Sequence, residues 1–403
     1  MSSSGRSKNA LAFILITIAL DAIGFGLIVP VLPALLKDLL GANAAEAAPW
    51  AGVLAFTYAA MNFLFSPLLG NLSDRFGRRP VLLISLASLC ADYLIMGFAH
   101  SIWLLILGRV LSGISGATQA TAKAYIADIT DLSERTRAFG LIGAAFGLGF
   151  ILGPAIGGLL GDLSPRAPFF AAAGLAFANV LYGWLVLPES LAPQLRRPFQ
   201  LSRANPLGTF ARIAKLPTIR WLLLSVMLFH FAHVVYPATW SFHGDARYGW
   251  EPRHIGFSLM AVGIGFTIVQ GGLVGPIARK LGNGRTAVLG VLCNAAAFVG
   301  FALATREWMI YAWIVAASLG AVGGPAVNSL MSSRVSNNAQ GELQGAVSSV
   351  QALSNMVAPL VMTQTFSHFA AREFYGAAFA LAAVLTLLSL VPLALGLRSS
   401  PQP

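Results

Sequence analysis

Twelve long apolar runs constrain this sequence more than any other feature. A helix that crosses a lipid bilayer needs about 20 predominantly apolar residues, and each run is close to that length. Because every backbone polar group must be satisfied inside lipid, such runs predict an all-α membrane protein. The predicted spanning helices lie near residues 9–36, 50–72, 80–99, 102–127, 136–161, 166–187, 218–243, 254–277, 284–304, 308–333, 342–366 and 372–396.

The composition agrees with a membrane protein and argues against a nucleic-acid partner. Hydrophobic residues make up 57% of the chain and charged residues 10%, whereas soluble domains carry about 25% charged residues. The net charge of +11 is spread over many short loops, as the positive-inside rule produces. The two cysteines lie inside apolar runs and indicate no disulfide framework or metal site. With a cytoplasmic N-terminus, an even number of spanning helices also places the C-terminus in the cytoplasm.

A polar and basic segment, residues 189–217, interrupts the apolar pattern near the middle of the chain. It predicts a cytoplasmic linker between an N-terminal six-helix half, residues 1–188, and a C-terminal six-helix half, residues 218–403. Two parallel repeats of this kind bind their substrate near the bilayer midplane, between the halves. The halves repeat at a constant spacing of 205 residues, which relates Gly70 to Gly275, Gly77 to Gly282, Trp103 to Trp308, Gly140 to Gly345 and Pro154 to Pro359.

A short charged loop, residues 70–80, follows the second run and is predicted to form a cytoplasmic gate. Its arginines hold the loop on the cytoplasmic side, and Asp74 can form a bidentate pair with an arginine. Asp128, near the cytoplasmic end of the fourth run, can receive Arg75 or Arg78. The alternative is a positive-inside anchor with an incidental acid. The predicted gating residues are Gly70, Asp74, Arg75, Gly77, Arg78, Arg79 and Asp128.

The equivalent loop of the second repeat, residues 275–282, differs in its charges. It carries Arg279 at the place of Asp74, so the gate is predicted in the N-terminal half alone. Gly70 and Gly77 are predicted to permit a close approach of the backbone or of neighbouring helices.

Three of the charged residues lie deep inside predicted spanning helices. Asp21 and Asp92 are each about 18 Å deep, and Arg109 is about 10 Å from the outer end of its helix. A carboxylate at that depth costs about 2.5–3.5 kcal/mol on insertion scales and must face protein or water. We therefore predict a proton pathway through Asp21 and Asp92, with Arg109 either pairing with Asp21 or orienting the substrate. The alternatives are a structural ion pair for Asp21 and an interhelical hydrogen bond for Asp92.

Two further groups of residues are candidates for function. Small residues in the fifth run predict close helix packing, with a proline kink: Gly149, Gly153, Pro154, Gly157 and Gly158. Residues at mid-depth elsewhere are candidates for a substrate cavity, although each can instead hold helices together: Asn62, His230, His233, Tyr236, Phe266, Gln270 and Asn294.

The charged loop Gly70-Asn71-Leu72-Ser73-Asp74-Arg75-Phe76-Gly77-Arg78-Arg79-Pro80 resembles G-x-L-[SA]-D-R-x-G-R-R-P, the loop motif of the major facilitator superfamily. The fifth run resembles the antiporter motif G-x-x-x-G-P-x-x-G-G. Over nearly the whole chain the similarity is greatest to the tetracycline-resistance exporters, which are drug–proton antiporters. It is also carried by Asp21 with Gly24, Gly26, Pro30 and Pro33, by Asp92-Tyr93, and by residues 124–131, 165–173 and 188–190.

This resemblance implies the major facilitator fold, with twelve helices in two pseudo-symmetric halves, and no enzyme activity. It implies proton-coupled export of a drug-like small molecule of tetracycline type, by alternating access, in a bacterial cytoplasmic (inner) membrane. The implied partners are the substrate, protons and the lipid bilayer, and a monomer is expected. No cofactor is implied, and a divalent metal ion enters only as part of a drug chelate.

The sequence departs from this family at three positions. The family's second-helix glutamine falls at Asn62, its eighth-helix histidine at Phe266 and its ninth-helix acid at Asn294. The C-terminal half has therefore lost titratable groups, and coupling is expected to rest on Asp21 and Asp92. Three alternatives stay open, namely a proton symporter for a small metabolite, an uncoupled facilitator and a non-transporting membrane sensor. The sequence has no phosphate-binding glycine loop that would bring in energy from ATP.

Overall fold

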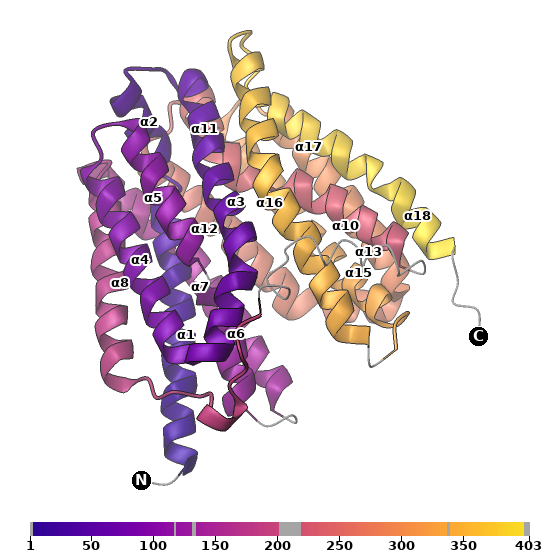
Figure 1. The fold of residues 1–403 in the computed structure, drawn as a ribbon. Coiled ribbons are helices and arrows are strands. Elements are labelled where there is room, and N and C mark those ends of the chain that lie inside the picture. The colour runs from indigo at the N-terminus through magenta and orange to yellow at the C-terminus, as the bar shows by residue number, and fades with distance from the viewer. Residues whose placement is uncertain (1–2, 117, 131–133, 201–218, 337–338, 399–403) are drawn as a thin grey trace. The chain divides into compact units, whose positions relative to one another are not determined.

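The structure, a computed structural model, describes residues 3–116, 118–130, 134–200, 219–336 and 339–398. Within these ranges all regular secondary structure is helical, which confirms the predicted fold class (Figure 1). The helices of the first part of the chain are α1 (Ser3–Ile28), α2 (Leu32–Leu40), α3 (Ala44–Phe76), α4 (Arg78–Phe98), α5 (Ile102–Ser115), α6 (Thr118–Ile129), α7 (Arg135–Leu163), α8 (Ala167–Val186) and η1 (Pro193–Leu195). Those of the second part are α10 (Arg220–His233), α11 (Val235–Tyr248), α12 (Pro252–Ile268), η3 (Val269–Leu273), α13 (Val274–Leu303), α14 (Glu307–Gly320), α15 (Gly323–Ser332), α16 (Gln340–Ala370), α17 (Ala377–Leu388) and α18 (Leu390–Arg398).

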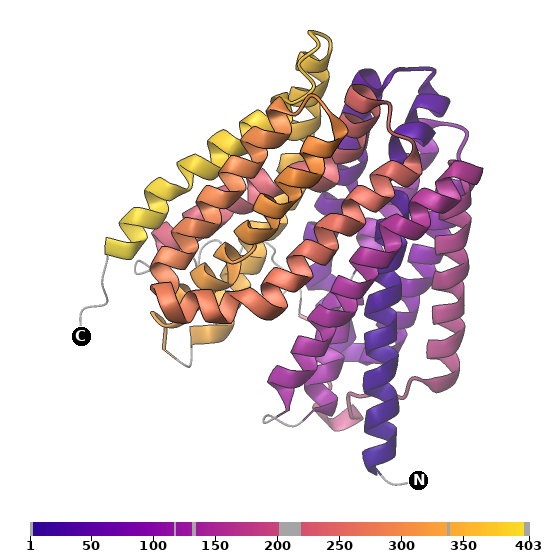
Figure 2. The same ribbon diagram turned by 180° about the vertical axis from the view of Figure 1, so that it is seen from behind.

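Eleven helical segments of the described residues are long and apolar enough to cross a membrane, and one of them contains two of the predicted runs. The segment Pro252–Leu303 has 52 residues, about 78 Å of helix at 1.5 Å per residue. That length is more than twice the hydrocarbon thickness of about 30 Å. Gly282 breaks it with non-helical backbone angles, φ 75° and ψ 158°. Figure 2 shows this part of the chain doubling back on itself. The segment therefore accommodates the runs predicted near 254–277 and 284–304.

The first predicted run, 9–36, is wrong at its C-terminal end. The helix stops at Ile28, a turn follows at residues 29–31, and α2 begins at Leu32. Pro30 and Pro33 explain the break, because proline removes a backbone donor and clashes with the preceding helical turn. Four other predicted runs are each formed by two helices in direct succession: α5 with α6, α10 with α11, α14 with α15, and α17 with α18.

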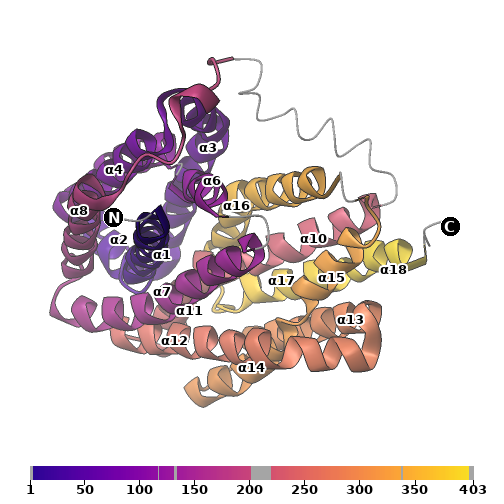
Figure 3. The same ribbon diagram turned by 90° about the horizontal axis from the view of Figure 1, so that it is seen from below.

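The chain forms two compact units, which we describe separately. Unit 1 consists of residues 1–42, 57–206 and 251–260. In it α1 lies between α7 and α8, while α4 packs against α5 and α8 (Figure 3). Its buried cluster includes Phe13, Leu86 and Tyr125. In a membrane such contacts stabilise the fold mainly by van der Waals packing, because lipid tails are as apolar as leucine.

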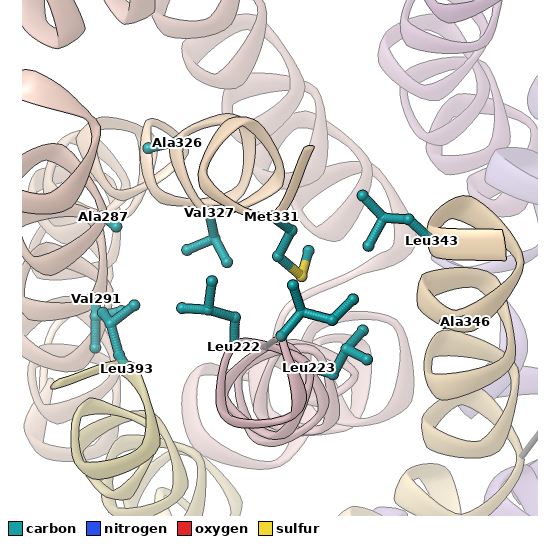
Figure 4. Close-up of a cluster of buried hydrophobic side chains, with 11 residues drawn as sticks. Leu222, Leu223, Ala287, Val291, Ala326, Val327, Met331, Leu343, Ala346 and Leu393 are labelled. Atoms are coloured by element: carbon teal, nitrogen blue, oxygen red, sulfur yellow. The ribbon is translucent and has the colours of Figure 1, made fainter. Parts of the chain in front are cut away.

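Unit 2 consists of residues 43–56, 207–250 and 261–403. In it α13 packs against α14, α15 and α17, and α10 packs against α16, α17 and α18. Figure 4 shows part of its core, where branched side chains from several helices meet. The labelled residues are Leu222, Leu223, Ala287, Val291, Ala326, Val327, Met331, Leu343, Ala346 and Leu393. Of the predicted linker, residues 189–200 are described, and residues 201–217 lie outside the described residues.

Candidate functional site

The charged loop is reduced to a single residue between two helices. α3 ends at Phe76 and α4 begins at Arg78, so only Gly77 lies between them, with φ 107° and ψ 161°. Essentially only glycine adopts such angles. A methyl group on Gly77 would also collide with the Glu189 carboxylate. The prediction of close approach thus holds at Gly77 but is wrong at Gly70, where an added methyl group would meet no atom within 4 Å.

Arg78 joins two helices through two carboxylates. Its Nη1 atom lies 2.6 Å from Asp74 Oδ1, and its Nε atom lies 3.2 Å from Asp128 Oδ2. The Ser190 hydroxyl donates to the same Asp128 oxygen at 3.1 Å. Of the two arginines considered for Asp128, the structure therefore selects Arg78. Because the Arg78 side chain is only 12% exposed, its charged hydrogen bonds are partly shielded from water and are correspondingly stronger.

The other two arginines of the loop do not contact these acids. The Arg75 guanidinium lies 5.0 Å from the centre of the neighbouring Phe76 ring. Arg79 donates from Nη2 to the backbone carbonyl of Trp184 at 2.6 Å, which ties α4 to α8. The acid–arginine contacts at the predicted gate are therefore centred on Arg78.

Sequence reasoning missed Glu189 as a member of this site. Its carboxylate accepts backbone hydrogen bonds from Arg78 at 2.8 Å, Arg79 at 3.2 Å and Leu191 at 3.0 Å. Two of these N–H groups belong to the first turn of α4, where the helix dipole favours an anion. The segment Pro188-Glu189-Ser190 was visible as a family signature, but its spacing from the loop by more than 100 residues concealed the contact. Glu189 thus attaches the chain after α8 to the start of α4.

A buried ion pair lies within unit 1. Arg109 Nη2 on α5 is 3.0 Å from Asp92 Oδ2 on α4, and the Asp92 side chain is 0% exposed. Gly108 leaves room for the acid, since a methyl group there would lie 2.6 Å from Asp92 Oδ1. Arg109 also contacts the Met96 sulfur. The partner of Arg109 is therefore Asp92. The hypothesis that Arg109 pairs with Asp21 is wrong for this structure. Removing either charge would leave the other buried without its partner.

Asp21 lies on α1 and is half-buried. Tyr93 links the two sites: its ring packs against α1 at Gly24, where an added methyl group would lie 2.6 Å from the Tyr93 hydroxyl oxygen. Tyr93 is within electrostatic range of both Asp21 and Asp92, and so is Tyr58. Two carboxylates and one guanidinium therefore lie near a common pair of tyrosines. Such an arrangement can bind a proton and redistribute charge among its members.

The small residues of α7 form the surface on which α1 packs. Methyl groups on Gly149 and Gly153 would lie 2.6 Å from the Ala19 carbonyl oxygen and 2.7 Å from the Ile23 carbonyl oxygen. Gly157 likewise contacts the backbone of Leu27, and Pro154 lies inside the helix. Gly158 faces α12 instead, 2.6 Å from the Pro252 carbonyl oxygen by the same measure. The predicted packing role is therefore present, and any role in transport stays a prediction.

In unit 2 the two histidines of α10 each contact an asparagine. His233 Nε2 lies 3.0 Å from Asn294 Oδ1 on α13, and His230 Nε2 lies 3.1 Å from Asn355 Oδ1 on α16. The Asn294 side chain is almost fully buried. These contacts hold α10 to its neighbours, which is the structural alternative stated for the same residues.

The remaining cavity candidates occupy different environments. Tyr236 is buried among aromatic rings, including those of Trp240, Phe298, Phe301 and Phe379. Asn62 donates to the Gly116 carbonyl at 2.6 Å and so joins α3 to the break between α5 and α6. Phe266 is half-buried and Gln270 is exposed. The contribution of these residues to substrate binding stays a prediction.

Comparison with known proteins identifies the family. Residues 14–359 match the family model described as the Major Facilitator Superfamily. The chain is 40% identical over 391 residues to the class C tetracycline resistance protein of Escherichia coli, covering 97% of this chain and 98% of that protein. It is 39% identical over 369 residues to the class G protein of Vibrio anguillarum, covering 90% and 91%.

Solved structures with similar folds include the human organic anion transporter MFSD10, with a TM-score of 0.70, 23% identity and 96% of this chain and 99% of that chain covered. A bacterial homologue of the human lysosomal transporter Spinster, inward-facing and unoccupied, has a TM-score of 0.77 with 16% identity and full coverage of both chains. At these identities the likeness concerns the fold alone. The family model and the closely similar relatives together show that this chain is a multi-pass membrane protein of the major facilitator superfamily.

Proposed function

We propose that this protein exports a drug-like small molecule of tetracycline type in exchange for protons, by alternating access. The observation that carries the proposal is the ion pair of Asp92 and Arg109, with Asp92 fully buried inside a membrane-spanning segment. Ionisable residues inside spanning helices are costly and commonly mark substrate or proton pathways. The tetracycline resistance proteins, at about 40% identity over nearly the whole chain, support a drug as the transported molecule.

In this proposal Asp21 and Asp92 take up and release the transported protons. A proton on Asp92 removes its attraction for Arg109, so the guanidinium is free to move or to meet another acceptor. A substrate that binds one conformation more tightly shifts the population toward it by that difference in affinity. The contacts of Arg78 with Asp74 and Asp128 would contribute to the relative stability of the two states at the cytoplasmic end.

The proposal also concerns the form of the substrate, the membrane and the oligomeric state. A tetracycline would be carried as a complex with a divalent metal ion, and the metal would then be cargo and not a resident cofactor. The positions Phe266 and Asn294, where the related exporters carry a histidine and an acid, allow a different drug class. We further propose a monomer in a bacterial inner membrane, with both termini in the cytoplasm.

The test uses inside-out vesicles in which respiration acidifies the lumen. Tetracycline with magnesium, and then a panel of lipophilic drugs, is added while the luminal pH is recorded by fluorescence. We expect a drug-dependent release of protons from vesicles that contain the parent protein and none with Asp21→Asn. Asp38→Asn is the matched control, because Asp38 is 69% exposed and its substitution should leave the response unchanged.

The other outcomes distinguish the remaining functions. Drug entry that stops at equal concentrations on the two sides, without any proton release, would indicate an uncoupled facilitator. No response to any drug, with the protein shown to be in the membrane, would contradict drug export and direct the search to metabolite uptake. An equal response in Asp21→Asn vesicles would remove Asp21 from the coupling mechanism.

A further inference from the structure

A chain of polar contacts crosses unit 2 from α10 to α13. His233 Nδ1 lies 2.8 Å from the Phe229 carbonyl oxygen on its own helix. His233 Nε2 lies 3.0 Å from Asn294 Oδ1, and Asn294 Nδ2 donates to the Gly290 carbonyl at 3.0 Å. The chain therefore begins and ends at a backbone carbonyl, and both carbonyls can only accept hydrogen bonds.

The two backbone carbonyls determine how many protons this series of hydrogen bonds needs. The amide of Asn294 must direct its NH₂ group toward Gly290, because the opposite orientation would place two oxygens face to face. Its oxygen then faces His233, so both ring nitrogens of His233 meet acceptors. A neutral imidazole has one N–H group and satisfies only one of them, whereas the imidazolium satisfies both. All hydrogen bonds in this series form only when His233 carries one added proton.

The ring of His233 is surrounded by aromatic side chains. Aromatic ring centres lie 4.1 Å away for Phe229, 5.3 Å for Phe298 and 6.0 Å for Tyr236, and aromatic faces attract cations at such distances. The titratable side chains that face the ring are His230, one turn earlier on α10, and Tyr236 on α11. The contacts from α13 come from Asn294 and Phe298, which are uncharged. Among the described residues, no carboxylate contacts the His233 ring.

We propose that His233 is a proton-binding site of the C-terminal half, loaded during one part of the transport cycle. This inference rests on the proposed function, because it adds a proton carrier to the same antiport. It also reassigns His233 and Asn294 from the substrate cavity to proton handling. Proton uptake there forms the second N–H bond of His233, and release returns the neutral ring with one contact of the chain unsatisfied.

The first experiment measures the proton directly and needs no substrate. The purified protein, labelled with ¹⁵N-histidine in lipid nanodiscs, is examined by NMR from about pH 8 to about pH 5, the range in which histidine changes charge. The chain has 6 histidines, so the His233 signal is assigned by its loss in His233→Gln. We expect an imidazolium signal from His233 within this range. A ring that stays neutral throughout would overturn the proposal, whatever the outcome of transport assays.

His230→Gln is the matched control, since His230 lies on the same helix and contacts a single asparagine through Nε2. Its spectrum should retain the imidazolium signal of His233. Asn294→Asp supplies a second variant, in which a carboxylate replaces the amide beside Nε2. An anion at that distance favours the charged ring, so its imidazolium signal should persist to higher pH than in the parent. An unchanged signal in Asn294→Asp would contradict the assigned geometry.

The second experiment asks whether this proton is transported. In the inside-out vesicles, the number of protons released per drug molecule is measured for the parent, for His233→Gln and, as the control, for the exposed Asp38→Asn. We expect a lower ratio for His233→Gln alone, with drug–drug exchange retained. An unchanged ratio would overturn the transport role. If the parent itself shows no drug-dependent proton release, the proposed function is refuted. The NMR result would still decide whether His233 binds a proton.

Discussion

Two loops at equivalent places in the repeat share a backbone conformation but differ in their chemistry. Gly77 and Gly282, separated by the repeat spacing of 205 residues, have φ and ψ of 107° and 161°, and of 75° and 158°. Around Gly77 the acids Asp74, Asp128 and Glu189 hold the Arg78 side chain and the start of α4. A methyl group on Gly282 would meet no atom within 4 Å.

The comparison distinguishes the glycine conformation, which both repeats share, from the carboxylate contacts, which are found around the first loop. The non-helical glycine belongs to both repeats and lets the chain reverse between successive spanning helices. The carboxylates gather around the first loop, and Arg279 stands in the second loop where the first has Asp74. Among the described residues no carboxylate pairs with Arg279. A conformational equilibrium that depends on acid–arginine contacts at these loops would therefore be controlled from the N-terminal half.

The largest effect is expected from comparing Gly77→Ala with Gly282→Ala. Both substitutions impose backbone strain of about 1–3 kcal/mol, but Gly77→Ala also displaces the Glu189 carboxylate from two backbone N–H groups. We expect a clearly lower thermal unfolding midpoint for Gly77→Ala than for Gly282→Ala in detergent. The measurement is unfolding monitored by tryptophan fluorescence. Equal losses in the two variants would show that the surroundings of Gly77 add nothing to the strain.

An intermediate effect is expected from Glu189→Gln. The substitution keeps the shape of the side chain but removes the charge that accepts hydrogen bonds at the start of α4. Hydrogen bonds to charged groups contribute about 1.5–3 kcal/mol, and part of this should be lost in a chemical unfolding experiment. Glu307→Gln is the control, because Glu307 also lies in the first turn of a helix and is exposed. A loss for Glu307→Gln equal to that for Glu189→Gln would argue against the described contacts.

The smallest effect is expected from Gly70→Ala and Gly275→Ala. Both glycines are helical, and an added methyl group meets no atom within 4 Å at either position. Alanine is preferred over glycine inside helices by about 0.5–1 kcal/mol, so stability should be unchanged or slightly raised. Thermal unfolding of the two variants checks this. A large loss at Gly70 alone would indicate a close contact in another conformation of the protein.

The fold was predictable because it depends on a strong local signal. Apolar runs of membrane-spanning length predicted the helical class, and the loop motif predicted the family. The breaks inside the runs were predicted less well. Pro30 and Pro33 were visible in the first run, but transmembrane helices often tolerate proline, since neighbours satisfy the freed backbone groups. Composition therefore could not decide between a kinked helix and two helices.

The candidate site was predictable in its residues but not in its pairings. Depth alone singled out Asp21, Asp92 and Arg109, yet depth does not decide which helices are adjacent. Arg109 pairs with Asp92 because α4 and α5 pack together and Gly108 leaves room for the acid. Glu189 escaped prediction for a related reason. Its partners are backbone N–H groups, which every residue except proline carries, so the contact leaves no mark in side-chain composition.

The contact between α1 and α7 has a mechanical consequence. Gly149, Gly153 and Gly157 contact the stretch of α1 from Ala19 to Leu27, largely through backbone atoms. Flexible side chains, which could absorb a small displacement by changing rotamer, are largely absent from this contact. A shift or tilt of α7 must therefore be transmitted to the segment of α1 that carries Asp21. Asp21 would then change its exposure to water because α1 and α7 move together as one rigid pair.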